Sequence, residues 1–382
     1  MAFENLRKIQ PSVADVLSRN LCSGLLPRSI LFSGACGTGR LTGAMDLAFY
    51  LTGERRDVLR TQNIIYFPHR EMLPRVKAAV ALFREQRTQK SRLFLIETLR
   101  EVNMQYNDAV SASLSASSLR MFETAQNIDL FLTGLEDRSE VTDADVKDLD
   151  SLTKSIFNPK YLYLGKSSPS CVSIEMLRSV KEWMTSSYSE KVVIIEDLES
   201  ATDGAKNSIL KMLEEPDEHF TIILVSSQSQ RIMETILSRV RKFSFPSLTG
   251  DRISSLLRER FNVWDEFSSF DSFYFREGND SDSVRECEEK VSSFVSLLSC
   301  GSEITLEEED ALNLLLERLS AYGYFRERVI EETRSRMRNA LIPPVKARRI
   351  MDIIARWSES VEIYNMNDKS GLDYMIREAS VV

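Results

Sequence analysis

The feature that most constrains this chain is a short apolar run that leads directly into a glycine-rich loop. The run Ser29 to Phe32 is apolar enough for a buried strand, and Gly34-Ala-Cys-Gly-Thr-Gly39 follows it. A helical pattern then extends from about Arg40 to Leu51. This order places backbone N–H groups and a helix N-terminus around one point, the arrangement that cradles a phosphate. The sequence therefore predicts an α/β fold with a phosphate-type loop at the sheet edge.

The two residues that normally complete such a cradle are replaced. Arg40 stands where a Lys reaches the terminal phosphates, and Leu41 stands where a Ser or Thr hydroxyl holds magnesium. Arg is a planar fork rather than a point charge, and Leu cannot ligate a metal. Thr42 lies one position too late, so it substitutes only if the helix starts out of register. A relic turn that binds no nucleotide productively is the alternative to a degenerate nucleotide site. The candidate site residues here are Gly34, Gly37, Thr38, Gly39, Arg40 and Thr42.

A second alternation of helix and strand begins near Val172. A helix to about Ser187, a strand over 191–195, a helix to Glu215 and a strand over 220–225 follow one another. Strands that alternate with helices form a parallel sheet covered on both faces. After Pro246 no strand pattern recurs, and the remaining chain reads as helices.

Residues 71–165 interrupt this alternation and are periodic at helical spacing, so we interpret them as a helical insertion. Most of their basic residues lie between Arg75 and Arg100, and most of their acidic residues lie between Glu123 and Asp150. This division of charge predicts two solvated helix faces that attract each other.

Bulk composition excludes several other classes of protein. A net charge of −8 argues against a chain that wraps nucleic acid alone over a large area. The N-terminus has no apolar core of signal-peptide length, and no apolar run is long enough to span a bilayer, so we expect a cytoplasmic protein without membrane contact. The 5 cysteines are scattered without a C-x-x-C pair, and there are only 2 histidines. We expect neither a disulfide framework nor a metal site.

Paired carboxylates, Glu196 and Asp197, end the strand that starts at Lys191. The carboxyl end of a parallel strand is where ligands of open α/β sheets bind. In working ATPases of this class an Asp organises magnesium and the Glu after it orients the attacking water. The order is inverted here, and a misplacement near 1 Å can cost about a hundredfold in rate. The inversion predicts loss of hydrolysis independently of Arg40 and Leu41.

Four segments together form a specific pattern: Lys191-Val-Val-Ile-Ile-Glu-Asp, Asn207-Ser-Ile-Leu-Lys-Met-Leu-Glu-Glu-Pro216, Ile223-Leu-Val-Ser-Ser227 and Thr235-Ile-Leu-Ser-Arg239. With them the chain resembles the bacterial clamp-loader subunits of DNA polymerase III. It resembles the gamma/tau ATPase and, more closely, its delta-prime relative, all members of the AAA+ family. The family's four-cysteine zinc module is missing, and the helical insertion stands in its place.

The resemblance implies roles for several polar residues. Ser238-Arg239 is similar to the family's S-R-C motif, with Val240 in place of Cys, whose arginine reaches the ATP site of the adjacent subunit as an arginine finger. The alternative is that Arg239 caps its own helix. Ser226 or Ser227 would be the polar group near the gamma phosphate, or a strand cap. Arg285 resembles the second-sensor arginine of a lid helix, or is a surface arginine.

The resemblance also implies the architecture and partners. We expect a RecA-like AAA+ domain over 1–247 containing the insertion 71–165, a helical lid over 248–300 and a C-terminal helical collar over 301–382. We expect an ATPase-degenerate stator, with at most weak ATP or ADP binding of its own, that contacts the ATP of a neighbour. The implied partners are the gamma/tau and delta subunits, and indirectly the sliding clamp and primer-template DNA.

Two other functions remain open: an active gamma/tau-like ATPase, and an AAA+ protein of another DNA pathway.

In the expected collar, apolar residues recur at helical spacing, which either a collar helix or burial within the domain explains. They are Leu312, Leu314, Leu315, Leu319, Tyr322 and Phe325.

Overall fold

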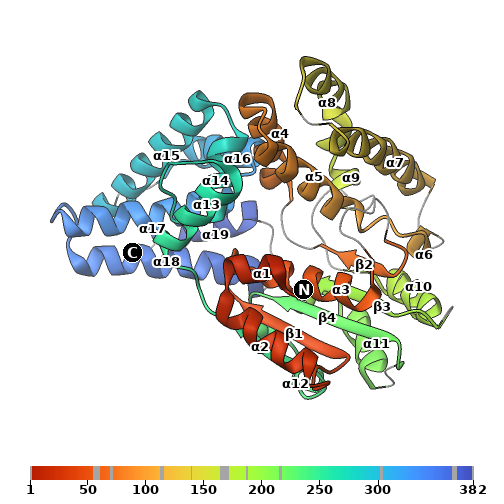
Figure 1. The fold of residues 1–382 in the computed structure, drawn as a ribbon. Helices are drawn as coiled ribbons and strands as arrows, with labels where there is room; N and C mark the ends of the chain where they lie inside the picture. Colours follow the sequence, from red (N-terminus) through yellow and green to blue (C-terminus); the bar gives the residue numbers. More distant parts are fainter. Residues whose placement is uncertain are drawn as a thin grey trace. The chain divides into compact units, whose positions relative to one another are not determined.

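The computed structural model divides the chain into two compact units, Met1–Phe270 and Asp271–Val382 (Figure 1). It describes residues 2–54, 61–68, 72–111, 116–138, 140–163, 172–185, 188–214, 217–301, 304–363 and 368–380. Glu215, Pro216 and Ser187, which bound two of the expected helices, lie outside these ranges. Within the described ranges, no helix is long and apolar enough to cross a membrane.

A five-stranded parallel sheet forms the centre of the first unit, with the strand order β2-β3-β4-β1-β5. Register is continuous across it, since Ile223 pairs with Ile30 on one side and with Ile194 on the other. The predicted α/β class with a parallel sheet is confirmed. The strands are β1 (Ser29–Gly34), β2 (Ile64–Phe67), β3 (Lys191–Glu196), β4 (Phe220–Ser226) and β5 (Arg241–Phe245).

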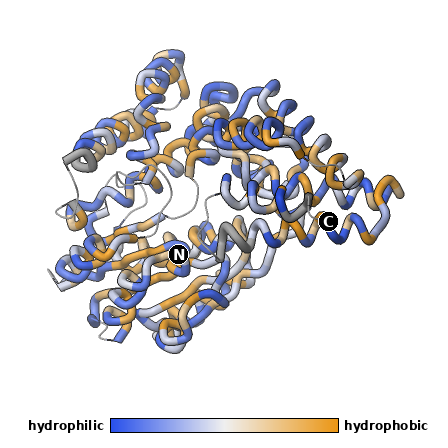
Figure 2. Tube along the Cα trace, turned by 180° about the vertical axis from the view of Figure 1, so that it is seen from behind, coloured by the Kyte–Doolittle hydropathy of each residue, from blue (hydrophilic) through white to orange (hydrophobic). Residues whose placement is uncertain are grey.

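Helices cover both faces of this sheet, as the alternation of helix and strand requires. Side chains such as Phe32, Ile194 and Val225 pack on one face against α1 (Glu4–Ile9), α2 (Pro11–Cys22) and α3 (Arg40–Thr52). On the opposite face, Trp183 of α10 (Ile174–Met184) meets Phe220 with ring centroids 6.3 Å apart. Figure 2 shows hydrophobic residues gathered along the strands and alternating along the helices. The short or flanking helices between β3 and β5 are η1 (Leu198–Ser200), α11 (Asp203–Glu214), η2 (Ser229–Arg231) and α12 (Glu234–Leu237).

Residues 72–163 of the first unit form helices without a strand among the described positions. The basic and acidic halves attract each other, as expected: Arg84 pairs with Asp150, and Arg87 pairs with Asp143 at 2.6 Å. The helices are α4 (Leu73–Gln86), α5 (Gln89–Asn103), α6 (Asp108–Ser111), α7 (Ala116–Glu136), α8 (Asp143–Ile156) and α9 (Pro159–Leu162).

Helix α13 (Gly250–Phe261) packs against α5 within the first unit. The rings of Phe94 and Phe261 lie 4.3 Å apart, and Arg260 pairs with Glu97 at 3.0 Å. The predicted lid over 248–300 therefore contributes α13 to the first unit and its later helices to the second. The division at 247 and 300 stays a prediction.

The second unit is helical throughout its described residues and encloses its own core. Phe325 packs against Phe294 and Trp357, with ring centroids 5.3 Å and 6.4 Å away. Of the periodic apolar positions only Leu314 is strongly exposed, so burial within the domain accounts for the pattern. The helices are α14 (Phe270–Gly278), α15 (Ser281–Cys300), α16 (Leu306–Leu319), α17 (Tyr322–Arg338), α18 (Pro344–Ile363) and α19 (Asp368–Ser380).

Asp46 of α3 anchors the N-terminal helix α1 on the first unit. Its buried carboxylate accepts the backbone N–H groups of Asn5 at 3.0 Å and Leu6 at 2.9 Å, and the Asn5 side-chain amide at 2.9 Å. Charged acceptors make the stronger class of hydrogen bond. The carboxylate thus satisfies N–H groups that a helix N-terminus leaves without intrahelical partners.

Replacing this anchor should destabilise the first unit. We expect Asp46→Ala to lower the free energy of unfolding by about 1–3 kcal/mol, because the buried N–H of Leu6 and the partly buried N–H of Asn5 lose a charged acceptor. Asp150→Ala, which removes only an exposed ion pair with Arg84, should cost less than about 1 kcal/mol. Urea unfolding followed by circular dichroism compares the two variants, and equal losses would contradict the anchoring role.

Candidate functional site

The loop between β1 and α3 needs glycine at three positions. A Cβ atom on Gly34 would lie 2.3 Å from the carbonyl oxygen of Phe245, a distance no side chain tolerates. Gly37 and Gly39 have φ angles of 74° and 86°, in the left-handed region that favours glycine. The helix starts at Arg40, as the sequence predicts. The loop therefore has the backbone form of a phosphate cradle.

Neighbouring groups hold this loop from two sides. The side-chain amide of Gln10 donates to the carbonyl oxygen of Thr38 at 2.9 Å and to that of Pro246 at 2.7 Å. The hydroxyl of Thr38 donates to the carbonyl oxygen of Ala35 at 2.8 Å. The ring of Phe270 would lie 3.1 Å from a Cβ atom on Gly37. These contacts hold the buried Thr38, while residues 35–37 are exposed, and the Thr38 hydroxyl is turned back onto the loop itself.

Arg40 and Leu41 are both buried and do not suit a magnesium nucleotide. The guanidinium of Arg40 places Nη2 3.8 Å from the Cys36 sulfur, and its buried Nη1 has no hydrogen-bond partner among the described residues. Leu41 packs into the core between the sheet and α1–α3, where a metal-binding hydroxyl would be expected. Thr42 is half-buried one position later. These residues fit at most an anion near Arg40 and offer no metal ligand at position 41.

The inverted carboxylates at the end of β3 have different environments. Glu196 is buried and accepts a hydrogen bond from the Tyr66 hydroxyl at 2.6 Å. Asp197 has left-handed backbone angles, φ 46° and ψ 48°, and donates its N–H to the carbonyl oxygen of Val225 at 2.8 Å. Asp is one of the few residue types that adopt this conformation at low cost. The Glu196 carboxylate is thus hydrogen-bonded to the neighbouring strand β2.

Ser226 ends β4 beside a carboxylate that sequence reasoning missed. Its buried hydroxyl donates to Oε1 of Glu199 at 2.5 Å and accepts from the Gln228 N–H at 3.0 Å. Ser227 follows it, half-buried. Burial, and then the nearby Asp197 carboxylate, raise the pKa of Glu199. Nothing in the sequence distinguishes Glu199 from other acids, because its burial depends on the short turn η1.

Arg239 lies just beyond the end of α12 and is exposed, in contrast to Arg40. Its Nη1 donates to the carbonyl oxygen of Thr235 at 2.8 Å and to the Ser238 hydroxyl at 3.2 Å. Its Nη2 pairs with Oε1 of Glu214 at 2.9 Å, and both side chains are more than one third exposed. The bond to Thr235 is the contact expected of a helix C-terminal cap. The guanidinium is accessible to a second molecule all the same.

Arg285 is distant from these residues in the sequence and belongs to the second unit. It lies on α15 of the second unit, where it is exposed and pairs with Asp282 at 2.9 Å and Glu289 at 3.9 Å. Its role as a second sensor stays a prediction. For metals, the described residues contain no group of three or more His, Cys, Asp or Glu side chains that could hold an ion.

These features define the class of the protein. A parallel sheet of order β2-β3-β4-β1-β5 carries a glycine loop after β1, carboxylates after β3 and a serine at the end of β4. Ligands of such sheets bind at the carboxyl ends of the strands. The first unit is therefore a RecA-like α/β domain of the AAA+ class.

Comparison with known proteins shows which family part of this chain is similar to. The family described as "DNA polymerase III, delta subunit" matches residues 74–249, a range that includes the helices from α4 to α9. The chain is 36% identical over 80 residues to DNA polymerase III subunit tau of Bacillus subtilis (strain 168), covering 21% of this chain and 14% of that protein. It is 37% identical over 71 residues to subunit delta' of the same organism, covering 19% of this chain and 22% of that protein. Residues 74–249, a little under half of the chain, thus match this family model, and both relatives are subunits of DNA polymerase III.

These matches span only part of each relative, less than a quarter of its length in both cases. A solved DNA polymerase III gamma subunit-related protein from Thermotoga maritima aligns over 61% of this chain and 90% of its own, with 18% identity and a TM-score of 0.29. That likeness is too low to add to the assignment.

The buried carboxyl of Glu199 generates a pH prediction. Because its pKa is raised in the folded protein, it contributes stability below its ordinary pKa that is lost as pH rises through the raised value. Gln resembles the protonated form, so Glu199→Gln should gain stability relative to the unmodified protein between pH 5 and pH 8. Urea unfolding at both pH values measures this change, with the exposed Glu218→Gln as the control. A pH effect no larger than that of the control would contradict the assignment.

Proposed function

We propose that this chain is a delta-prime-like stator subunit of the clamp loader of the replicative DNA polymerase III holoenzyme. In this proposal it acts in the cytoplasm during sliding-clamp loading and lacks ATPase activity of its own. It supplies Arg239, positioned by Ser238, to the ATP site of an adjacent subunit. Its partners are the gamma/tau and delta subunits, with the clamp and primer-template DNA engaged through the assembly.

One contrast carries the proposal: Arg40 and Leu41 of this chain's own loop are buried, whereas Arg239 is exposed. A trans-acting arginine must be reachable from outside its own subunit. Because this chain's own nucleotide site lacks a magnesium ligand, its carboxylate pair has no catalytic role to fulfil. Glu196 is instead hydrogen-bonded to Tyr66. The similarity of residues 74–249 to the DNA polymerase III delta subunit family supports the presence of the neighbour that such an arginine requires.

The contacts that hold Arg239 are weak enough to be exchanged for a phosphate. Its pair with Glu214 is exposed on both sides, and such pairs contribute about 0–1 kcal/mol. A bidentate guanidinium–phosphate contact is stronger than a neutral hydrogen bond by about twofold. Glu214, Thr235 and Ser238 would then orient the side chain before assembly without competing strongly for it afterwards.

Removing Arg239 should affect the ATPase activity of the assembled complex far more than the stability of this chain. We expect Arg239→Ala to leave thermal unfolding and subunit association close to normal. It should lower the DNA- and clamp-stimulated ATPase of the reconstituted complex by about a thousandfold or more, since arginine fingers contribute about 10³–10⁵ in the best-studied cases. Arg239→Lys should rescue little, because a point charge cannot reproduce the fork.

Arg84→Ala is the matched control, because Arg84 forms an ion pair of similar exposure with Asp150 on α8. It should retain full ATPase in the complex. Unchanged ATPase with Arg239→Ala would rule out the trans-acting role.

The isolated protein should bind ATP or ADP weakly and turn over ATP well below about 1 per second, the low end of typical enzymes. Arg40→Lys combined with Leu41→Thr should improve nucleotide binding more than hydrolysis, because the Glu196–Asp197 order stays inverted. Titration calorimetry and a phosphate-release assay measure the two effects. Magnesium-dependent turnover by the unmodified chain that Arg40→Ala abolishes would support an active ATPase instead.

A further inference from the structure

The second unit carries a concentrated basic segment that the proposed ATP chemistry does not use. Residues 333–351, here called the basic hairpin, comprise the end of α17, the connection and the start of α18. They contain six Arg or Lys residues and no Asp or Glu, in a chain of net charge −8. This segment is therefore strongly basic, whereas the rest of the protein is acidic overall.

Two of the six cations are tied to the second unit itself. Arg336 pairs with Glu332 at 2.6 Å and donates to the hydroxyls of Ser296 at 2.8 Å and Ser292 at 2.7 Å. Lys346 donates to the carbonyl oxygen of Ser299 at 2.8 Å. These contacts hold each of the two helices of the basic hairpin against α15.

The other four cations are exposed, and the described residues offer their side chains no ion pair or hydrogen bond. Four unpaired guanidinium groups within sixteen residues repel one another, and an anionic partner relieves that repulsion. They are Arg334, Arg338, Arg348 and Arg349.

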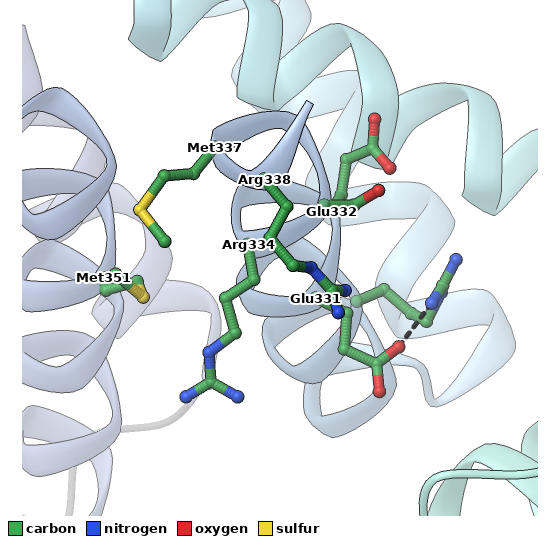
Figure 3. A pocket seen from close by; sticks show the side chains of 8 residues that line it. Glu331, Glu332, Arg334, Met337, Arg338 and Met351 are labelled. Carbon is green, nitrogen blue, oxygen red and sulfur yellow. Dashed lines mark hydrogen bonds and ion pairs between the residues drawn. The ribbon is translucent and has the colours of Figure 1, made fainter. Parts of the chain in front are cut away.

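Arg334 and Arg338 also line a cavity of about 750 Å³ on this unit. They are one helical turn apart on α17, and Met337 extends toward Met351 of α18 beside them (Figure 3). The two acids at the cavity, Glu331 and Glu332, are each paired, with Arg328 and Arg336. The net charge that the cavity presents is therefore positive.

We propose that the basic hairpin binds the phosphate backbone of DNA, without reading base sequence. Arginine forks match phosphate oxygens in a bidentate geometry. The segment contains no aromatic residue on which a base could stack, so recognition is limited to the backbone. The choice of DNA among polyanions rests on the proposed function, which places this chain at primer-template DNA.

The size of the effect follows from counterion release. Each phosphate neutralised on duplex DNA changes the slope of log affinity against log salt by about −0.9, so four arginines account for a slope of up to about −3.6. Binding by the chain alone should be of the non-specific class, with a dissociation constant of about 10⁻⁴ to 10⁻⁶ M.

The test uses the full chain without nucleotide or partner subunits. Fluorescence anisotropy with a labelled duplex of about 30 base pairs, between about 50 and 200 mM salt, gives the affinity and its salt slope. The variant carries Arg334→Gln, Arg338→Gln, Arg348→Gln and Arg349→Gln, and should lose at least tenfold in affinity and most of the salt slope. The control carries Lys8→Gln, Lys147→Gln, Lys154→Gln and Arg318→Gln, which changes net charge equally at other exposed positions, and should stay within about twofold.

Three results would overturn the proposal: no DNA binding by the unmodified chain at 50 mM salt, equal losses in variant and control, or unchanged binding by the variant. Hairpin-dependent binding to phosphatidylserine vesicles without DNA binding would assign the segment to a membrane surface instead. Because the assay contains no ATP or partner, its failure leaves the role of Arg239 standing. Failure of that role in turn leaves DNA binding measurable.

Discussion

The close approach of Gly34 to Phe245 is the constraint on which the rest of the first unit depends. It lets β1 and β5 run side by side to the point where the loop leaves the sheet, and any Cβ atom there would separate them. Gln10 then joins the loop to the end of β5, and Asp46 fixes α1 against α3. The phosphate-type loop therefore holds β1, β5 and α1 together as a structural joint, whether or not it binds a ligand.

Two pairs of buried polar groups beside that joint are hydrogen-bonded within the protein. Glu196 is bonded to Tyr66, and Ser226 is bonded to Glu199. Arg40 lies against Cys36, and Leu41 belongs to the core. Buried polar groups carry a cost unless they are paired. Pairing within the protein stabilises the sheet edge without a nucleotide, which accords with a subunit whose contribution to catalysis lies at its surface.

The sequence predicted the central strands and the helix after the loop well, because continuous apolar runs and glycines mark them. It missed β5, since Arg241, Lys242 and Ser244 are exposed on this edge strand and the apolar signal is reduced to two phenylalanines. It also missed Glu199 and Tyr66, whose importance arises from contacts between strands distant in sequence. The assignment of α13 to the first unit depends on Phe94, more than 150 residues earlier, and no local pattern reveals it. The sequence did not predict the basic hairpin, because the net charge of the whole chain averages over basic and acidic segments.

The most direct test of the central claim is a structure of the assembled complex with a non-hydrolysable ATP analogue. The account predicts the Arg239 guanidinium at hydrogen-bond distance, about 3 Å, from the terminal phosphate held by a neighbouring subunit, and no magnesium nucleotide in the loop from Gly34 to Gly39. A magnesium nucleotide in that loop, with Arg239 still paired to Glu214 and distant from every neighbouring nucleotide, would contradict it.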